Sequence, residues 1–242
     1  MDKLHSQELK TVFEGIESFK TDDIAHLYQK DEPHLKQTTL HWRIHHLVEK
    51  GILERIGKGI FKIGKNVVFN PNLDKKTKTI YNKIKSSFPF IEFCIWNTSV
   101  LNEFSLHQSN KHFTLIEVEK DSAESVFLFL KDQNHKVFFN PNAEILERYV
   151  FDASNPIIVK FLVSEAPLQK IKNYNTISLE KCLVDLYCDK ELFSFYQGKE
   201  KQTIFKEAYH KYTINNTKLL RYASRRGKKK EIENYIQQIN IQ

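Results

Sequence analysis

The sequence of 242 residues has few cysteines, glycines and prolines, and each shortage excludes a class of protein. Three cysteines cannot build a disulfide framework, and an odd number of thiols is typical of a reducing compartment. Seven glycines and six prolines exclude collagen-like and linker-dominated chains. The chain also lacks an apolar run of about 18 residues, and its first residues are polar, so we expect neither a membrane span nor a secretory signal. These absences predict a cytoplasmic protein that does not bind membranes.

Hydrophobic residues make up 40% of the chain, which is enough for a packed core and excludes wholesale disorder. At roughly 150 residues per domain, the length predicts one or two domains. Internal patterns must therefore decide where one domain ends and the next begins.

Positive charge is concentrated near the end of the chain. The net charge is +7, and residues 201–242 carry the whole excess, since residues 1–70 sum to +1 and residues 71–200 to −1. A solvated basic helix face explains such a run. Phosphate binding explains it equally, because guanidinium groups offer a planar pair of donors to phosphate oxygens. The densest part of the run contains Lys218, Arg221, Arg225, Arg226, Lys228, Lys229 and Lys230.

Three helices and a hairpin are predicted in the first 65 residues from apolar periodicity, capping residues and turn signals. The predicted elements are a helix over residues 7–19 capped by Ser6, a helix capped by Thr21, a helix from about Gln37 to Lys50, and strands over residues 52–56 and 60–63. The sequence Gly57-Lys58-Gly59 between the two strands is typical of a tight hairpin turn.

The third of these helices has two different faces. Its apolar stripe consists of Leu40, Ile44, Leu47 and Val48, and its opposite face carries Thr38, Trp42, His45, His46 and Glu49. A large aromatic side chain on an exposed face favours a binding surface. Three helices followed by a hairpin predict a winged helix-turn-helix, in which the third helix enters the DNA major groove. A domain that packs on the rest of the protein or forms a dimer is the alternative.

Ten residues of this region form a recognisable motif: Thr39, Trp42, Arg43, Leu47, Gly51, Leu53, Arg55, Gly57, Gly59 and Phe61. The motif resembles the N-terminal winged helix of AbiEi-type antitoxins, a family of bacterial abortive-infection and type IV toxin–antitoxin operons. Ile44 replaces the leucine of that family and Phe61 replaces its tyrosine, and both changes keep the apolar character.

Strands and helices alternate from Asp74 onward, and helices dominate after residue 179. The predicted strands are residues 90–96, 112–119, 136–140 and 156–164, and the predicted helices are residues 75–86, 98–104, 121–131, 179–188, 204–212, 217–226 and 230–239. We therefore predict an α+β protein of three parts. They are a winged helix-turn-helix domain over residues 1–66, an α/β domain with a mixed sheet over residues 67–200, and a basic helical extension over residues 201–242 packed on it.

Two further motifs resemble the C-terminal domain of AbiEi-like proteins. The first consists of Trp96, Thr98, Leu101, His107 and Gln108, and the second of Glu180, Lys181, Leu183, Val184, Asp185 and Leu186. The resemblance implies a DNA-binding antitoxin that represses its own operon. It also implies a nucleotidyltransferase-like toxin encoded nearby, with which the antitoxin need not form a stable complex.

A metal-dependent nuclease is the main enzymatic alternative, because Glu92, Glu117 and Glu119 lie on or beside predicted strands. Glu117 and Glu119 share one strand face, but Lys120 lies on the other, so an E-x-K motif is absent and a solvated strand end is the preferred interpretation. His41 and His45 have metal-ligand spacing, with His46 adjacent, but polar groups beside DNA explain them better. The cysteines Cys94, Cys182 and Cys188 are expected to be buried thiols. We expect no catalytic residue, no metal and no cofactor.

Operator DNA is the expected partner. Base or sugar contacts are predicted for Thr38, Trp42, Arg43 and His45, and Thr39 is also predicted to bind DNA. Phosphate contacts are predicted for Lys36, Arg55, Lys58, Arg221, Arg225, Arg226, Lys228, Lys229 and Lys230. Binding of the basic tail to the toxin or to structured RNA is an alternative. A dimer suits a palindromic operator, and a monomer that uses two domains is equally compatible.

Overall fold

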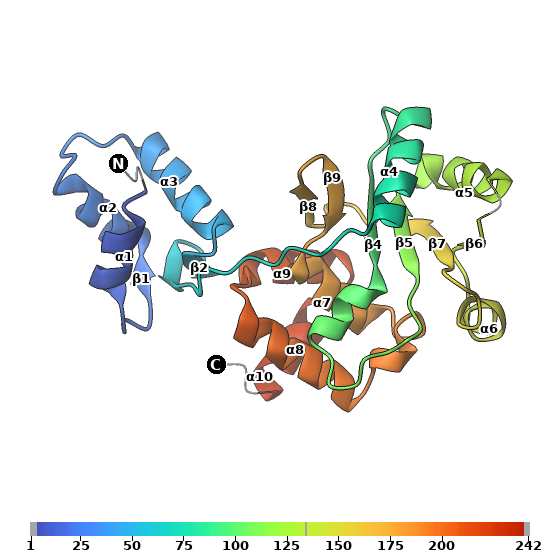
Figure 1. Cartoon of the computed structure of the whole chain (residues 1–242). Coiled ribbons are helices and arrows are strands. Elements are labelled where there is room, and N and C mark those ends of the chain that lie inside the picture. Colours follow the sequence, from blue (N-terminus) through green and yellow to red (C-terminus); the bar gives the residue numbers. More distant parts are fainter. Residues whose placement is uncertain (1–3, 134, 240–242) are drawn as a thin grey trace. The chain divides into compact units, whose positions relative to one another are not determined.

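The computed structural model describes residues 4–133 and 135–239 and divides by internal contacts into two compact units (Figure 1). Residues 1–69 together with 208–221 form the first, which we call the N-terminal unit, and residues 70–207 together with 222–242 form the second, which we call the sheet unit. The basic segment after residue 201 is therefore divided between both units, whereas the predicted domain boundaries made it a separate extension. The polar residues 1–3, used above to argue against a signal sequence, lie outside the described residues.

The N-terminal unit combines three helices with a small antiparallel sheet, in the strand order β1-β3-β2. Its elements are α1 (Ser6–Phe13), β1 (Phe19–Lys20), α2 (Thr21–Gln29), α3 (Gln37–Glu49), β2 (Leu53–Gly57) and β3 (Ile60–Ile63). Leu9, Ile24, Tyr28, Leu40 and Ile44 lie in its core and join all three helices. The third helix and the hairpin thus form where the apolar periodicity predicts them.

The first two helices differ from their predicted limits. Helix α1 ends at Phe13 instead of residue 19, because Gly15 has φ +76° and turns the chain, which leaves Val12 and Ile16 exposed. Thr21 is the first residue of α2 rather than its cap. The carboxylate of Asp23 accepts a hydrogen bond from the backbone N–H of Lys20 at 2.7 Å, which satisfies a donor at the start of the helix.

Residues 208–221 belong to the N-terminal unit through specific hydrogen bonds. Lys65 Nζ donates to the carbonyls of Tyr209 and His210, each at 2.6 Å. Thr213 Oγ1 donates to the carbonyl of Gly51 at 3.0 Å and accepts from the backbone N–H of Lys65 at 2.8 Å. A segment far along the chain therefore closes the base of the β2–β3 hairpin.

The sheet unit is built on a mixed sheet in the order β4-β5-β7-β6, in which only β4 and β5 are antiparallel neighbours. Its elements up to the second hairpin are α4 (Lys75–Ser87), β4 (Phe93–Asn97), a 3₁₀ helix (Thr98–Glu103), β5 (Thr114–Val118), a 3₁₀ turn (Lys120–Ser122), α5 (Ala123–Asp132), β6 (Val137–Phe139), α6 (Ala143–Ile145), a π-helical turn (Leu146–Val150), β7 (Ile157–Phe161), β8 (Leu168–Ile171) and β9 (Tyr174–Ile177). The remaining elements are α7 (Leu179–Cys188), a 3₁₀ turn (Ser194–Tyr196), α8 (Lys199–Lys211), α9 (Asn216–Arg225) and α10 (Lys229–Gln238). Helices α8 and α9 cross the boundary between the units.

The two faces of this sheet differ in chemistry because side chains alternate along each strand. One face packs Ile95, Ile116 and Val159 against α4 and α5, and this is an apolar core (Figure 1). The opposite face carries Trp96, Cys94 and Glu117, and Glu117 pairs in register with Lys160 on β7. This second face meets α7 through a direct contact between Glu117 and Lys181.

The predicted fold class is confirmed at the level of an α+β protein with a mixed sheet and C-terminal helices. The predicted α-helix after β4 is a 3₁₀ helix, and the helical turns over residues 143–150 and the β8–β9 hairpin were not predicted. Within residues 4–133 and 135–239, no helix is both long and apolar enough to cross a bilayer.

Candidate nucleic-acid interface

The exposed face of α3 is centred on Trp42, whose exposed fraction is 52%. Thr38 and His45 are exposed beside it, while Ile44 and Leu47 on the opposite side are buried. The indole ring lies edge-on to the ring of His46, with 4.3 Å between ring centroids. This contact orients the indole while leaving much of it open to solvent.

Charge on this helix is graded from one end to the other. The first turn, residues 37–40, all described by the structure, carries no carboxylate, and Lys36 precedes it with an exposed side chain. Unpaired backbone N–H groups give that end a partial positive charge. At the other end, Glu49 lies 3.4 Å from His45 Nε2 and 3.1 Å from His46 Nδ1. An anion would therefore meet the beginning of α3 more favourably than its end.

The β2–β3 hairpin presents Lys58 at its turn. Gly59 has φ +69°, a conformation that suits glycine, and its carbonyl accepts a hydrogen bond from the backbone N–H of Thr21 at 3.0 Å. Lys58 is exposed, whereas the half-buried Arg55 lies over the ring of Phe61, 5.0 Å from its centroid. Lys58 is therefore free to reach a phosphate, and Arg55 is partly engaged within the unit.

Arg43, for which a DNA contact was predicted, does not lie on the exposed face of α3. Its exposed fraction is 8%, and its Nη2 donates to both carboxylate oxygens of Glu32, at 2.8 and 3.0 Å. The guanidinium also lies over the ring of Tyr28, 4.7 Å from the centroid. Arg43 therefore fastens α3 to the segment after α2. Thr39, which was also predicted to bind DNA, is half-buried.

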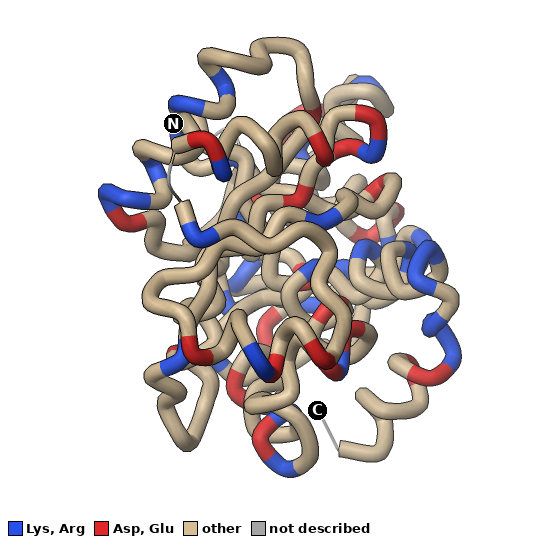
Figure 2. The backbone as a smooth tube through the Cα atoms, turned by 90° about the vertical axis from the view of Figure 1, so that its right-hand side faces the viewer, with Lys and Arg blue, Asp and Glu red and all other residues tan. Residues whose placement is uncertain are grey.

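Three cations of the predicted basic tail are paired with carboxylates, Arg226 in a mostly buried pair and Arg225 and Lys228 in exposed pairs. Arg226, for which a phosphate contact was predicted, donates instead to Asp185 and Asp189, each at 2.5 Å, with a side-chain exposed fraction of 15%. Arg225 pairs with Glu165, and Lys228 Nζ lies 2.8 Å from Glu231. Figure 2 shows basic and acidic residues at intervals along the backbone.

Four of the predicted cations in the last part of the chain are exposed. They are Arg221, which lies in the N-terminal unit, and Arg225, Lys229 and Lys230 in the sheet unit; Arg225 pairs with Glu165. The free positive charge is therefore smaller than the composition of residues 201–242 indicates, and it is shared between the two units.

A buried network of charges fills the second face of the sheet. Lys181 Nζ donates to both oxygens of Glu117, at 2.6 and 2.7 Å, and to Asp185 at 2.5 Å. Trp96 Nε1 donates to Glu117 at 3.0 Å, and Tyr222 donates its hydroxyl to Asp185 at 2.9 Å. The network continues outward to a second pair, in which Lys160 Nζ donates to Asp189 Oδ2 at 2.7 Å. With Arg226 it contains three cations and three carboxylates, so it carries no net charge.

Burial and ion pairing act in opposite directions on these groups. Burial alone would raise the pKa of Glu117, but Lys181 and Lys160 outweigh it and hold this pKa below its ordinary value. Burial alone would lower the pKa of Lys181, but Asp185 and Glu117 raise it well above its ordinary value. The pair therefore stays ionised at neutral pH.

This network overturns the expectation that Glu117 and Glu119 form a solvated strand end. Glu117 is buried and both its oxygens are bound by Lys181, while the half-buried Glu119 accepts a hydrogen bond from Ser122 at 3.3 Å. In this arrangement the oxygens of Glu117 are engaged by Lys181 instead of facing solvent, and Glu119 is engaged by Ser122. The thiols of Cys94 and Cys182 are buried, as expected, and burial raises the pKa of the half-buried Cys188 to about 11.

A cavity of about 370 Å³ opens beside this network and is lined by Lys160, Asp189, Asn140 and Cys188 among others. The two charged groups at its wall already neutralise each other. The outer end of the network is therefore accessible, whereas its inner end at Lys181 is sealed.

The molecule is thus an α+β protein that presents an aromatic helix face in one unit and buries a neutral charge network in the other. The chain belongs to a family of unknown function (DUF6577), whose model matches residues 39–242. The match covers most of α3, the hairpin and the whole sheet unit. No curated protein matches the chain.

Proposed function

We propose that this protein is a DNA-binding transcriptional regulator whose N-terminal unit acts as a winged helix-turn-helix. In this proposal α3 is the recognition helix and the β2–β3 hairpin is the wing. The resemblance to AbiEi-type antitoxins extends the proposal to a cytoplasmic antitoxin that represses its own type IV toxin–antitoxin operon. A nucleotidyltransferase-like toxin encoded nearby would be its counterpart.

The exposed indole of Trp42 is the observation that carries the proposal. The indole is half exposed among polar side chains in the middle of the helix that would enter the major groove, and apolar surface with a polar rim is typical of an interaction site. The apolar side of the same helix is already used for the core. The exposed side is therefore available for a partner.

The charges around Trp42 favour a nucleic acid as that partner. Lys36 and the positive end of α3 lie before the indole in the chain, and Lys58 projects from the hairpin turn. We assign base or sugar contacts to Thr38, Trp42 and His45, and phosphate contacts to Lys36 and Lys58. Arg221, Lys229 and Lys230 are assigned to additional phosphate contacts.

Tryptophan fluorescence provides a direct test because the two tryptophans differ in environment. Trp42 is half exposed, whereas Trp96 is 1% exposed, so acrylamide should quench the first and spare the second. Addition of duplex DNA from upstream of the gene should protect the quenchable fraction, while fluorescence anisotropy of labelled DNA reports binding independently. DNA binding that leaves Trp42 fully quenchable would remove α3 from the interface.

A protein-binding module is the second candidate, because the hairpin also exposes apolar side chains. Ile56 and Ile60 are exposed on β2 and β3. A protein partner such as the toxin would bury them together with Trp42. Co-purification with the product of the adjacent gene, in the absence of DNA, would favour this candidate.

A further inference from the structure

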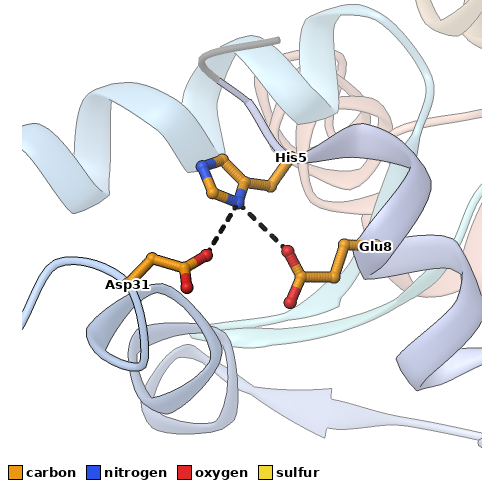
Figure 3. Close-up of side chains that lie close together, drawn as sticks. All are labelled: His5, Glu8 and Asp31. Carbon is orange, nitrogen blue, oxygen red and sulfur yellow. Dashed lines mark hydrogen bonds and ion pairs between the residues drawn. The ribbon is translucent and has the colours of Figure 1, made fainter. Parts of the chain in front are cut away.

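Three potential metal ligands converge at the start of α1, in the N-terminal unit (Figure 3). His5 Nδ1 lies 3.1 Å from Glu8 Oε2 and 3.7 Å from Asp31 Oδ2. Glu8 projects from α1, and Asp31 lies in the segment that follows α2. Figure 3 shows that one ring nitrogen faces both carboxylates. The three donor atoms all lie within 4.8 Å of one another.

The imidazole is held in this orientation by the surrounding chain. His5 adopts a left-handed backbone conformation with φ 46°, and its carbonyl accepts the N–H of Leu9 at 3.0 Å as α1 begins. The ring lies edge-on to the ring of Tyr28, with 5.3 Å between centroids. The hydroxyl of Tyr28 donates to the carbonyl of Leu4 at 2.7 Å, which fixes the residue before the histidine. These contacts hold the imidazole ring with Nδ1 facing the two carboxylates, so the ring would not have to turn to bind an ion between them.

The spacing of the donors suits a transition-metal ion. Zinc binds histidine nitrogen and carboxylate oxygen at about 2.0–2.2 Å, which places neighbouring donors of a tetrahedral or octahedral site about 3.0–3.5 Å apart. The distance of 3.1 Å lies within that range, and the distance of 3.7 Å lies just above it. A nitrogen donor among two carboxylates disfavours Mg²⁺ and Ca²⁺, which prefer oxygen ligands. Two carboxylates also match the charge of a divalent ion.

We infer that His5, Glu8 and Asp31 bind a divalent first-row transition-metal ion, with Zn²⁺ as the preferred occupant. The ion would tie the beginning of α1 to the segment between α2 and α3. Asp31 directly precedes Glu32, the residue that holds Arg43 of α3. The ion would therefore stiffen the segment on which the orientation of α3 depends. This inference concerns metal binding alone and does not require the proposed DNA-binding function.

Titration of untagged, metal-free protein with Zn²⁺ or Co²⁺ tests the inference. Isothermal titration calorimetry should give one equivalent of Zn²⁺ per chain, and Co²⁺ should produce a visible absorption band. Glu8→Gln and Asp31→Asn keep the size of each side chain but remove a charged donor, so each should weaken Zn²⁺ binding by at least about 10- to 100-fold. Far-UV circular dichroism should show that both variants remain folded.

Matched controls separate this site from other surface ligands. Glu14→Gln and Asp22→Asn alter exposed carboxylates of the same unit outside the cluster, and they should leave the affinity unchanged. The variant His41→Ala/His45→Ala removes the other candidate pair of ligands. Unaltered Zn²⁺ binding in both Glu8→Gln and Asp31→Asn would overturn the inference, as would loss of binding in His41→Ala/His45→Ala alone.

Discussion

The charged residues of the two units differ in what they contact. In the sheet unit, Lys181 and Arg226 are enclosed by carboxylates that neutralise them. In the N-terminal unit, Lys36 is exposed at the start of α3 and Lys58 is exposed at the turn of the β2–β3 hairpin. The difference teaches that the density of cations along a sequence does not measure the positive charge that a partner can reach.

Helical spacing explains why the charged residues of the sheet unit pair with one another. Lys181, Asp185 and Asp189 recur every four residues, so they lie along one side of α7 and its C-terminal cap. Tyr222 of α9 and Arg226, which directly follows α9, are also four residues apart. Both donate hydrogen bonds to Asp185. A buried charge is tolerated only with a partner, and here each buried charge has at least one.

The largest expected effect comes from breaking the buried network. Lys181→Met leaves Glu117 and Asp185 without their shared cation, so we expect the free energy of unfolding to fall by about 3–5 kcal/mol. Urea denaturation measures this change. The exposed Lys229→Met is the matched control and should stay within about 0.5 kcal/mol of the wild type. Equal losses in both variants would contradict the contrast between enclosed and exposed lysines.

A smaller effect is expected from the exposed face. Trp42→Ala removes the central side chain of the candidate interface, so operator affinity should fall by about 1–3 kcal/mol, which is about 5- to 150-fold in Kd. Its unfolding free energy should change little, because the indole is half exposed. Phe90→Ala is the control, since Phe90 is 97% exposed in the sheet unit. The proposed interface would be wrong if both variants bound DNA as the wild type does.

The phosphate contacts should appear as changes in salt dependence. Lys58→Ala should reduce the slope of log affinity against log salt by about 0.9, because one phosphate contact is lost. Lys229→Ala/Lys230→Ala should reduce it by about 1.8 if α10 also contacts the backbone. Titrations at several salt concentrations measure both. A slope that responds only to Lys58→Ala would confine the interface to the N-terminal unit.

The smallest effect concerns a carboxylate at the base of the hairpin. Burial raises the pKa of Glu54 above its ordinary value of 4.5, although Lys62 partly offsets this at 3.4 Å. The folded state therefore binds the proton more tightly than the unfolded state, and ionisation of Glu54 costs stability as pH rises above 4.5. Glu54→Gln should be slightly more stable than the wild type at pH 7, by less than about 1 kcal/mol. Denaturation at pH 7 and pH 4 should show the gain shrinking in acid; a gain that grows in acid would contradict the assignment.

Local patterns in the sequence predicted much of the fold. The limits of α7 match the prediction, because Ser178 caps it by accepting the N–H of Lys181 and its apolar residues recur with helical period. The exposure of Trp42 followed from the same periodicity in α3. Periodicity could not predict the β8–β9 hairpin, whose short strands are only partly buried and show little alternation.

The polar partners could not be predicted, because they are distant in the chain. Glu117 and Lys181 are 64 residues apart, and nothing within β5 indicates that its carboxylate is neutralised. Arg43 has a helical spacing that places it at the edge of the apolar stripe, but Glu32 lies in an irregular segment. The cluster of His5, Glu8 and Asp31 likewise depends on how that segment returns to α1.

The N-terminal unit is discontinuous in sequence, since the chain leaves it after residue 69, returns at 208 and leaves again after 221. A fragment ending near residue 69 would lose Thr213 and the carbonyls that Lys65 binds. Single-point recombination cannot transplant such a unit intact, so transfer of this unit between genes would have to preserve two separate stretches of coding sequence. Limited proteolysis should accordingly release no stable fragment that contains the first stretch alone.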